Sequence, residues 1–349
     1  MSFKAFISGC AGTALSAAER DLFAAERPCG LILFARNVES PAQVCALVAS
    51  FKAAVGSDAV LVLVDQEGGR VQRLRPPHWR AMPPVRCFGD LYTLDPEGAK
   101  RAAFAGARLM AAELHDAGIN VNCTPCLDIP QDGAHDIIGD RAFSTDPDAV
   151  SALGRAVMDG TLAGGVLPVI KHVPGHGRAL ADSHKSLPLI DASKEELEAV
   201  DFRPFQALHD APLAMTAHVL LPVFDECHPA TLSPAIMGKV IRDQLGLTGL
   251  IMSDDIGMKA LQGSYAALTR AVIDGGCDVV LHCSGKLSEM TDVAGAAPAL
   301  EGKAAERFEK ARSCLHDPEP FDEAEAMALV TEAAATRVAS LGADPTVQT

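Results

Sequence analysis

The sequence predicts an α/β fold consisting of a single TIM-type (β/α)8 barrel. Eight short apolar runs recur along the 349 residues, and most are rich in Val, Ile and Leu without regular polar alternation. Such runs are typical of parallel strands buried on both faces. Stretches with helical periodicity separate them, as in successive βα units. Eight units in a chain of this length fit a closed barrel better than an open doubly wound sheet.

The expected strands share their short length and apolar character. They are Lys4–Ser8, Gly30–Phe34, Val60–Val64, Ile119–Asn122, Val166–Ile170, Leu213–Thr216, Gly249–Met252 and Asp278–Leu281. The expected helices carry recognisable caps, such as Ser or Pro at the start and Gly at the end. They are Ala42–Ala54 after Ser40-Pro41, Ala102–Ala117 before Gly118, Lys194–Leu208 after Ser193, and a helix from Ser233-Pro234 to Leu245.

The chain divides, on this reading, into a catalytic barrel over residues 1–316 and a C-terminal extension over residues 317–349. The extension contains an Ala/Glu-rich helical stretch, Ala324–Leu341, followed by a polar tail. It is too short to form a second domain.

The composition narrows the classes of partner. There are 30 Lys and Arg against 45 Asp and Glu, a formal net charge of -15. A uniformly acidic surface repels phosphate backbones and anionic lipids, so we expect neither nucleic acid nor a membrane as partner. No apolar run approaches the roughly 20 residues of a membrane span. We expect a small-molecule substrate, and the oligomeric state stays open.

The ten cysteines show no disulfide pattern. Cys10, Cys29 and Cys45 have apolar neighbours and are predicted to be small buried hydrophobic residues. The one CxxC pair, Cys123 and Cys126, has no second pair of ligands to complete a zinc site, so buried thiols are favoured over metal or redox chemistry. A chain of this size does not need disulfides, and a reducing cytoplasm fits best.

Titratable groups follow the predicted strands, at the barrel edge that carries active sites in this fold. A single such residue would be explained as a solvated loop charge, but six strand ends have no common structural reason to carry them. These groups are Asp65-Gln66-Glu67, Asp128, Lys171-His172, His218, Ser253-Asp254-Asp255 and His282.

The loop after the fifth strand, residues 171–184, contains Pro174, Gly175 and Gly177, which indicate specific backbone geometry. Asp182 and His184 lie two residues apart and can pair in a turn, which would fix the imidazole tautomer and leave the other nitrogen free to move a proton. A metal held by His172, His176, Asp182 and His184 is the alternative. The spacing matches no zinc pattern, and Lys171 would repel a cation, so we expect no metal ligand set and no cofactor.

Two further segments supply candidate substrate contacts. Asp254 ends a buried strand and could be a nucleophile, a base or a ligand, whereas Asp255 is better explained as a structural hydrogen-bond acceptor. In Asp65–Leu74 a carboxylate and two arginines suit the recognition of sugar hydroxyls. An ion pair with Glu67 explains Arg70 at least as well as substrate contact does, and Arg141 is a similar polar residue in an ordered loop.

Four segments carry a resemblance to a known family: Leu33-Phe34-Ala35-Arg36-Asn37, Asp65–Leu74, Lys171–His184 and Ser253-Asp254-Asp255. The chain resembles glycoside hydrolase family 3 over roughly Phe3 to Leu300, and specifically its single-domain bacterial β-N-acetylglucosaminidases of peptidoglycan recycling (NagZ type). Departures from the family pattern are confined to Val173, Arg178–Leu180, and Cys123 and Cys126, where aliphatic residues are commoner.

The resemblance implies roles for particular residues. Asp254 would be the nucleophile and His184 the general acid/base, with Asp182 orienting it in a dyad. The sugar-binding set would be Asp65, Arg73, Arg141, Lys171 and His172. The implied activity is exo-acting and retaining: removal of non-reducing terminal β-1,4-linked N-acetylglucosamine from muropeptides, including N-acetylglucosaminyl-1,6-anhydro-N-acetylmuramic acid and its peptide-bearing forms. Such an enzyme would serve cytoplasmic cell-wall recycling, and with it cell division and cell shape.

Three alternatives remain at this point. Phosphate could replace water as the acceptor, which would make the enzyme a phosphorylase. A metal-dependent barrel hydrolase could use His172, His176 and His184. A sugar-binding or regulatory barrel without turnover is the third, although the presence of both Asp254 and His184 speaks against it.

Overall fold

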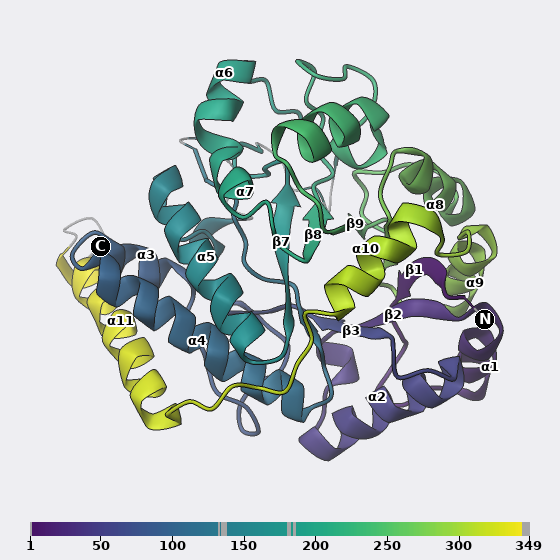
Figure 1. The fold of residues 1–349 in the computed structure, drawn as a ribbon, viewed down its shortest axis with the longest axis horizontal. Helices are drawn as coiled ribbons and strands as arrows, with labels where there is room; N and C mark the ends of the chain where they lie inside the picture. Colours follow the sequence, from purple (N-terminus) through teal and green to yellow (C-terminus); the bar gives the residue numbers. More distant parts are fainter. Residues whose placement is uncertain (1, 132, 134–137, 180–182, 184–185, 344–349) are drawn as a thin grey trace.

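The computed structural model describes residues 2–131, 133, 138–179, 183 and 186–343, with side chains described as far as Arg337. It contains a closed ring of eight parallel strands surrounded by helices, as the sequence predicts (Figure 1). The ring runs β1–β2–β3–β6–β7–β8–β9–β10 and returns to β1, where Ile7 pairs with Leu281. Its strands are β1 (Lys4–Ser8), β2 (Pro28–Leu33), β3 (Leu61–Val64), β6 (Val121–Asn122), β7 (Leu167–Val173), β8 (Leu213–Thr216), β9 (Leu250–Asp255) and β10 (Val279–His282).

All eight predicted runs become barrel strands, and the structure adds a hairpin that the sequence pattern does not reveal. The hairpin, β4 (Gln66–Gly68) and β5 (Val71–Gln72), follows β3 directly. Gly68 has a φ of 92°, and a Cβ there would lie 2.3 Å from the carbonyl oxygen of Pro83. Only glycine fits this position, which explains the Gly-Gly pair of the segment.

Successive strand residues point alternately into the barrel and toward the helices, because side chains alternate along a strand. Residues such as Ile7, Leu63, Val169 and Met252 fill the barrel interior in one apolar cluster. Their neighbours, such as Ile170 and Ile251, belong to the cluster between strands and helices. Both strand faces are therefore buried, which is why the runs lack polar alternation.

Helical structure is present at every predicted helical segment, although residues 194–208 form three short segments instead of one helix, and the structure adds further helices. The α-helices are α1 (Ala17–Glu26), α2 (Pro41–Val55), α3 (Arg86–Tyr92), α4 (Pro96–Asp116), α5 (Pro147–Ala163), α6 (Lys194–Glu196), α7 (Arg203–Ala207), α8 (Tyr265–Asp274), α9 (Leu287–Ala296), α10 (Gly302–Arg312) and α11 (Glu323–Ala343). Short helical turns are η1 (Ala35–Asn37), η2 (Gly139–Arg141) and η4 (Ala230–Leu232), and π-helical segments are η3 (Leu197–Asp201) and η5 (Ile236–Gln244).

One cysteine prediction is wrong. Cys10, Cys29, Cys123 and Cys126 are buried as expected, but Cys45 is exposed. It follows Val44, which belongs to the buried face of α2, and one residue along a helix turns the side chain by about 100°. Apolar neighbours in sequence therefore did not imply an apolar environment.

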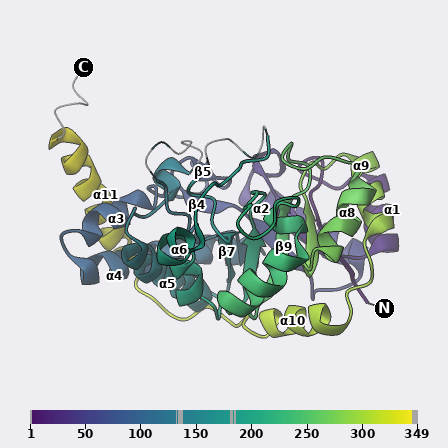
Figure 2. The same ribbon diagram turned by 90° about the horizontal axis from the view of Figure 1, so that it is seen from above.

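The two ends of the barrel are covered differently. Helix α10 packs Phe308 against Phe3 with ring centroids 5.7 Å apart, so it covers the end at which the strands begin. The β4–β5 hairpin lies on the opposite side of the molecule (Figure 2). Helix α11 packs on α4 through a cluster that includes Leu109, Ala326 and Val330.

The division of the chain into a barrel and an extension at residue 316 stays a prediction. No helix in the described ranges is long and apolar enough to cross a membrane.

Candidate active site

A cavity of about 350 Å³ opens at the carboxyl ends of the strands. Six of the eight residues predicted for the site line it: Asp65, Arg73, Arg141, Lys171, His172 and Asp254. Parallel strands end at one rim, which is why residues far apart in sequence meet there. The remaining two, Asp182 and His184, lie outside the described residues. Apolar side chains complete the wall, among them Phe34, Met215 and Met258.

Four charged groups that line the cavity and the buried Glu67 form a chain of alternating sign. Arg73 Nη2 lies 3.2 Å from Asp65 Oδ2, and Lys171 Nζ lies 2.8 Å from Asp65 Oδ1. Lys171 Nζ also lies 2.6 Å from Glu67 Oε1. Arg141 then donates from Nε and Nη2 to the two Glu67 oxygens, each at 2.8 Å. This charge chain, Arg73–Asp65–Lys171–Glu67–Arg141, fixes every member before any ligand binds.

The charge chain stays ionised near neutral pH. Burial favours the neutral forms of Asp65 and Glu67, but the facing Lys171 and arginines outweigh it. The pKa of Asp65 is therefore held well below its usual range, and the pKa of Glu67 is lowered to about 2. Burial opposes the charge on Lys171 too, yet Asp65 and Glu67 raise the pKa of its ammonium group above its usual value.

The contacts of Glu67 show that one of the two interpretations of Arg70 is wrong. The alternative of an ion pair between these two residues is wrong, because Glu67 is 3% exposed and is paired with Arg141 and Lys171. Arg70 Nε lies 3.4 Å from Asp140 Oδ1, on the rim. The sequence did carry a signal for Glu67: residues two apart in an extended segment face the same side, so Asp65 and Glu67 belong together.

Arg73 is positioned from two sides. The buried Gln66 accepts hydrogen bonds from the backbone N–H groups of Arg73 and Leu74 at 2.9 and 3.1 Å, so the hairpin returns Arg73 to the cavity. Its guanidinium carbon lies 5.6 Å from the ring centre of Phe34, within cation–π range. The buried Arg73 Nε has no hydrogen-bond partner among the described residues, so a donor remains for a ligand.

His172 is held by Asp128, which the sequence placed after the fourth barrel strand. His172 Nδ1 lies 2.6 Å from Asp128 Oδ2, and the backbone N–H of His176 donates to Asp128 Oδ1 at 2.7 Å. Asp128 is buried, which favours its neutral form, but the adjacent imidazoles hold its pKa well below the usual range. Asp128 therefore positions His172 and anchors the glycine-rich loop with the same carboxylate.

Steric fit fixes the loop that follows His172. A Cβ on Gly177 would lie 2.0 Å from the carbonyl oxygen of Ile129, so the two backbones touch. Arg178 Nε donates to the buried Asp201 at 2.6 Å. Ser183 is buried, its Oγ lies 3.2 Å from His176 Nε2, and its carbonyl accepts the Ala260 N–H at 3.1 Å.

Three described carboxylates line the cavity. Asp65 belongs to the charge chain, Asp255 has a structural role, and Asp254 is the third. Burial favours its neutral form, but His172, His218 and the Asp255 N–H, which donates at 2.7 Å, lower its pKa below the usual value. Asp255 is a structural acceptor as expected: its Oδ1 receives the N–H groups of Gly257 and Cys283, each at 3.0 Å. The two neighbouring carboxylates therefore differ in role: Asp254 is ionised, and Asp255 is a structural hydrogen-bond acceptor.

The other two strand-end histidines do not line the cavity. His218 is fully buried, with Nε2 3.1 Å from the Asp255 carbonyl oxygen and Nδ1 2.7 Å from Thr231 Oγ1. His282 is also fully buried and has its ring centre 5.0 Å from that of Tyr265. Among the described residues, one group could hold a metal ion: Cys126, Asp128 and His172.

Comparisons with known proteins agree with this architecture. The model of the glycosyl hydrolase family 3 N-terminal domain matches residues 7–313. A β-hexosaminidase of Xanthomonas campestris is 41% identical over 283 residues, which cover 80% of this chain and 84% of that protein. The native NagZ structure from Neisseria gonorrhoeae aligns with a TM-score of 0.82 and 29% identity over 96% of this chain and 97% of that one.

NagZ from Neisseria gonorrhoeae has also been solved in complex with N-trifluoroacetyl-D-glucosamine, and that structure aligns with a TM-score of 0.84 and 28% identity. It covers 96% of this chain and 98% of the other. Sequence identity and coverage at this level show membership of the family and not only a shared barrel fold. The chain therefore belongs to glycosyl hydrolase family 3 and is a glycoside hydrolase of the β-hexosaminidase, or NagZ, type.

Proposed function

We propose that this β-N-acetylhexosaminidase is exo-acting and retaining, and that it releases a non-reducing terminal β-1,4-linked N-acetylglucosamine. The observation that carries the proposal is the cavity itself. It combines an ionised carboxylate, Asp254, with the charge chain that contains Asp65 and Lys171. Its volume of about 350 Å³ falls at the small end of the range for small-molecule sites, as expected for one sugar ring.

Sugar binding is assigned to Asp65, Arg73, Arg141, Lys171 and His172. Asp65 accepts hydrogen bonds from sugar hydroxyls, and Arg73, whose Nε has no partner in the described part of the chain, donates one. Charged partners make these hydrogen bonds about twice as strong as neutral ones. The side chains are already ordered by the charge chain and by Asp128, so little conformational freedom is lost when the sugar binds.

Catalysis is assigned to Asp254, His184 and Asp182. Asp254 attacks the anomeric carbon and forms a glycosyl–enzyme bond, while His184 protonates the leaving oxygen. His184 then removes a proton from the attacking water, which releases the sugar with retained configuration. Asp182 orients His184. A neutral imidazole adds no second negative charge near Asp254, and its ordinary pKa of about 6.5 suits both proton transfers.

Two features support a place for the dyad at this cavity. Asp182 and His184 flank Ser183 in the sequence. Ser183 is buried, its Oγ lies 3.2 Å from His176 Nε2, and its carbonyl accepts a hydrogen bond from the N–H of Ala260, shortly after β9. Asp254, on β9, needs an acid/base partner because the described cavity wall offers no neutral carboxylic acid with a raised pKa apart from the structural Asp255.

The natural substrates we propose are muropeptides: N-acetylglucosaminyl-1,6-anhydro-N-acetylmuramic acid and its peptide-bearing forms. The support is the sequence resemblance together with the NagZ structures that align along almost the whole chain. The enzyme would then act in cytoplasmic peptidoglycan recycling and influence cell division and cell shape.

A chromogenic β-N-acetylglucosaminide tests the activity, with Asp254→Asn as the inactive control. NMR of the first-formed sugar should show the β-anomer, and an α-anomer would refute retention. The product should be free sugar at any phosphate concentration, whereas a sugar phosphate would establish the phosphorylase alternative. A kcat/KM for the anhydro-muropeptide no higher than for chitobiose would contradict the proposed substrate.

A further inference from the structure

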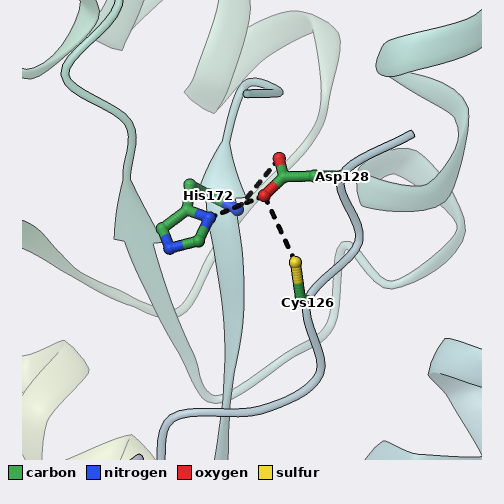
Figure 3. A group of neighbouring side chains, drawn as sticks. All are labelled: Cys126, Asp128 and His172. Carbon is green, nitrogen blue, oxygen red and sulfur yellow. Dashed lines mark hydrogen bonds and ion pairs between the residues drawn. The ribbon is translucent and has the colours of Figure 1, made fainter. Parts of the chain in front are cut away.

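The thiol of Cys126 lies beside the Asp128–His172 pair, and the proposed reaction gives it no role. Cys126 Sγ lies 3.3 Å from Asp128 Oδ2, the same oxygen that lies 2.6 Å from His172 Nδ1. Figure 3 shows the carboxylate between the sulfur and the imidazole, with Cys126 and Asp128 on the segment after β6 and His172 on β7. All three residues are buried. One oxygen is thus flanked by a sulfur and a nitrogen, each able to bind a metal.

The spacing is close to that of a metal centre. The three ligand atoms all lie within 4.8 Å of one another. Ligands of zinc at about 2.0–2.3 Å lie roughly 3.3–3.6 Å apart in a tetrahedron. The sulfur–oxygen separation already matches, and the nitrogen–oxygen separation of 2.6 Å must widen by less than about 1 Å once the shared proton leaves.

The carboxylate is already supported for this role. Asp128 Oδ1 accepts the backbone N–H of His176 at 2.7 Å and that of His172 at 3.4 Å, so Oδ2 is free to face the sulfur and nitrogen. Hydrogen bonds of this kind orient metal-bound carboxylates in known sites. The surroundings of the thiol are apolar, because Cys126 packs with Ile138 and Ala142.

Charge and ligand type select the ion. A thiolate, a carboxylate and a neutral imidazole together carry two negative charges, which a divalent cation neutralises. Sulfur and imidazole ligands favour zinc and similar soft ions over magnesium or calcium. Burial and Asp128 raise the pKa of the Cys126 thiol, so the divalent cation must displace its proton; Arg141 acts in the other direction, and its guanidinium is already paired with Glu67.

We propose that Cys126, Asp128 and His172 form an inhibitory site for a soft divalent cation such as Zn²⁺. Binding forms one bond each to Sγ, Oδ2 and Nδ1. The thiol proton is released to solvent, and the imidazole proton moves from Nδ1 to Nε2, so that His172 stays neutral. No oxidation takes place. The ion replaces the hydrogen bond that positions His172, which lines the sugar cavity, and so weakens substrate binding.

Cobalt spectroscopy tests binding, and zinc titration of the hydrolase reaction tests inhibition. Adding Co²⁺ to the wild-type chain should produce a thiolate-to-cobalt charge-transfer band, and Zn²⁺ should displace it. Cys126→Ser keeps a donor for Asp128 but removes the soft ligand, and Cys126→Val keeps the apolar packing. We expect both variants to lose the Cys126 part of the band and to keep their basal activity.

Loss of the sulfur ligand should raise the zinc concentration that halves activity by at least about tenfold. Cys45→Ser, which removes an exposed thiol, is the matched control and should behave like the wild type in both measurements. Equal zinc sensitivity and an unchanged cobalt band in Cys126→Ser would overturn the proposal. The cobalt band reports binding whatever the enzyme hydrolyses, so this failure is distinguishable from failure of the proposed function.

Discussion

The buried carboxylate of Glu67 provides a quantitative test of the charge chain. It pairs with both Lys171 and Arg141 and is 3% exposed. Glu67→Gln keeps the shape but leaves two buried cations with one fewer anion. Removing one partner of a buried ion pair costs about 3–5 kcal/mol. We expect the lower value, a loss of about 3 kcal/mol in unfolding free energy, because the Gln carbonyl still accepts one hydrogen bond.

The pKa of Glu67 gives a second route to the same magnitude. Folding lowers it from 4.5 to about 2, and one pKa unit corresponds to about 1.4 kcal/mol, so the charged form stabilises the fold by about 3 kcal/mol. Because the unfolded chain binds this proton more tightly, the stabilisation is complete above pH 4.5 and disappears as the pH falls toward 2.

Urea unfolding of the wild type and Glu67→Gln at pH 7 and at about pH 3.5 measures both effects. At the lower pH the wild type has lost about 1 kcal/mol of the Glu67 contribution, so the gap between the two proteins should narrow by about that amount. Groups that titrate in both proteins cancel in the comparison. We also expect KM for the chromogenic glycoside to rise, because Lys171 and Arg141 are no longer held in place.

Glu19→Gln is the matched control. Glu19 is equally buried, but it accepts backbone N–H groups from Ala11 and Ser16, both at 2.8 Å, and has no described cation within ion-pair distance. It should lose about 1–2 kcal/mol and leave KM unchanged. If Glu67→Gln loses less than about 1 kcal/mol, or no more than Glu19→Gln does, the charge chain does not have the energetic role argued for it.

Three further substitutions test other parts of the site. Asp254→Asn should lower kcat by more than about a thousandfold while the thermal unfolding curve stays in place, and near-normal turnover would remove Asp254 from the nucleophile role. Asp128→Asn should weaken the charge-assisted hydrogen bond to His172, which is worth about 1.5–3 kcal/mol. We therefore expect kcat/KM to fall about ten- to a hundredfold. An unchanged value would show that His172 needs no such support. Gly177→Ala should destabilise the fold by about 1–3 kcal/mol and reduce activity, because the added Cβ would clash with the Ile129 carbonyl. A stable, fully active variant would show that the loop has room to move.

The barrel could be predicted from sequence because its signal is local. Each buried strand is a short apolar run, and each run lies within a few residues of the strand in the structure. The β4–β5 hairpin left no such trace, because its strands are short and polar and depend on Gln66 binding the backbone of Arg73 and Leu74. Cys45 failed for a related reason: which face of a helix is buried depends on packing, not on sequence neighbours.

The candidate site was predictable in membership but not in pairing. Strand-end position brought Asp65, Lys171, His172 and Asp254 to one rim, and the family resemblance selected Arg73 rather than Arg70. The sequence suggested Arg70 as the partner of Glu67, whereas the structure pairs Glu67 with Arg141. Arg141 lies 74 residues away, and no local pattern links the two. The contact between Cys126 and His172 is likewise set by neighbouring barrel strands, so the sequence alone could not reveal it.

The packed interior of the barrel has a consequence for turnover. Residues such as Leu63 and Met215 fill the space beneath the cavity, and α10 covers the far end. Among the residues that the structure describes, these leave no route through the barrel, so we expect a released monosaccharide to depart by the opening that admits the next molecule. Departure and arrival compete for one passage, so accumulated monosaccharide should slow the reaction as a competitor of the substrate.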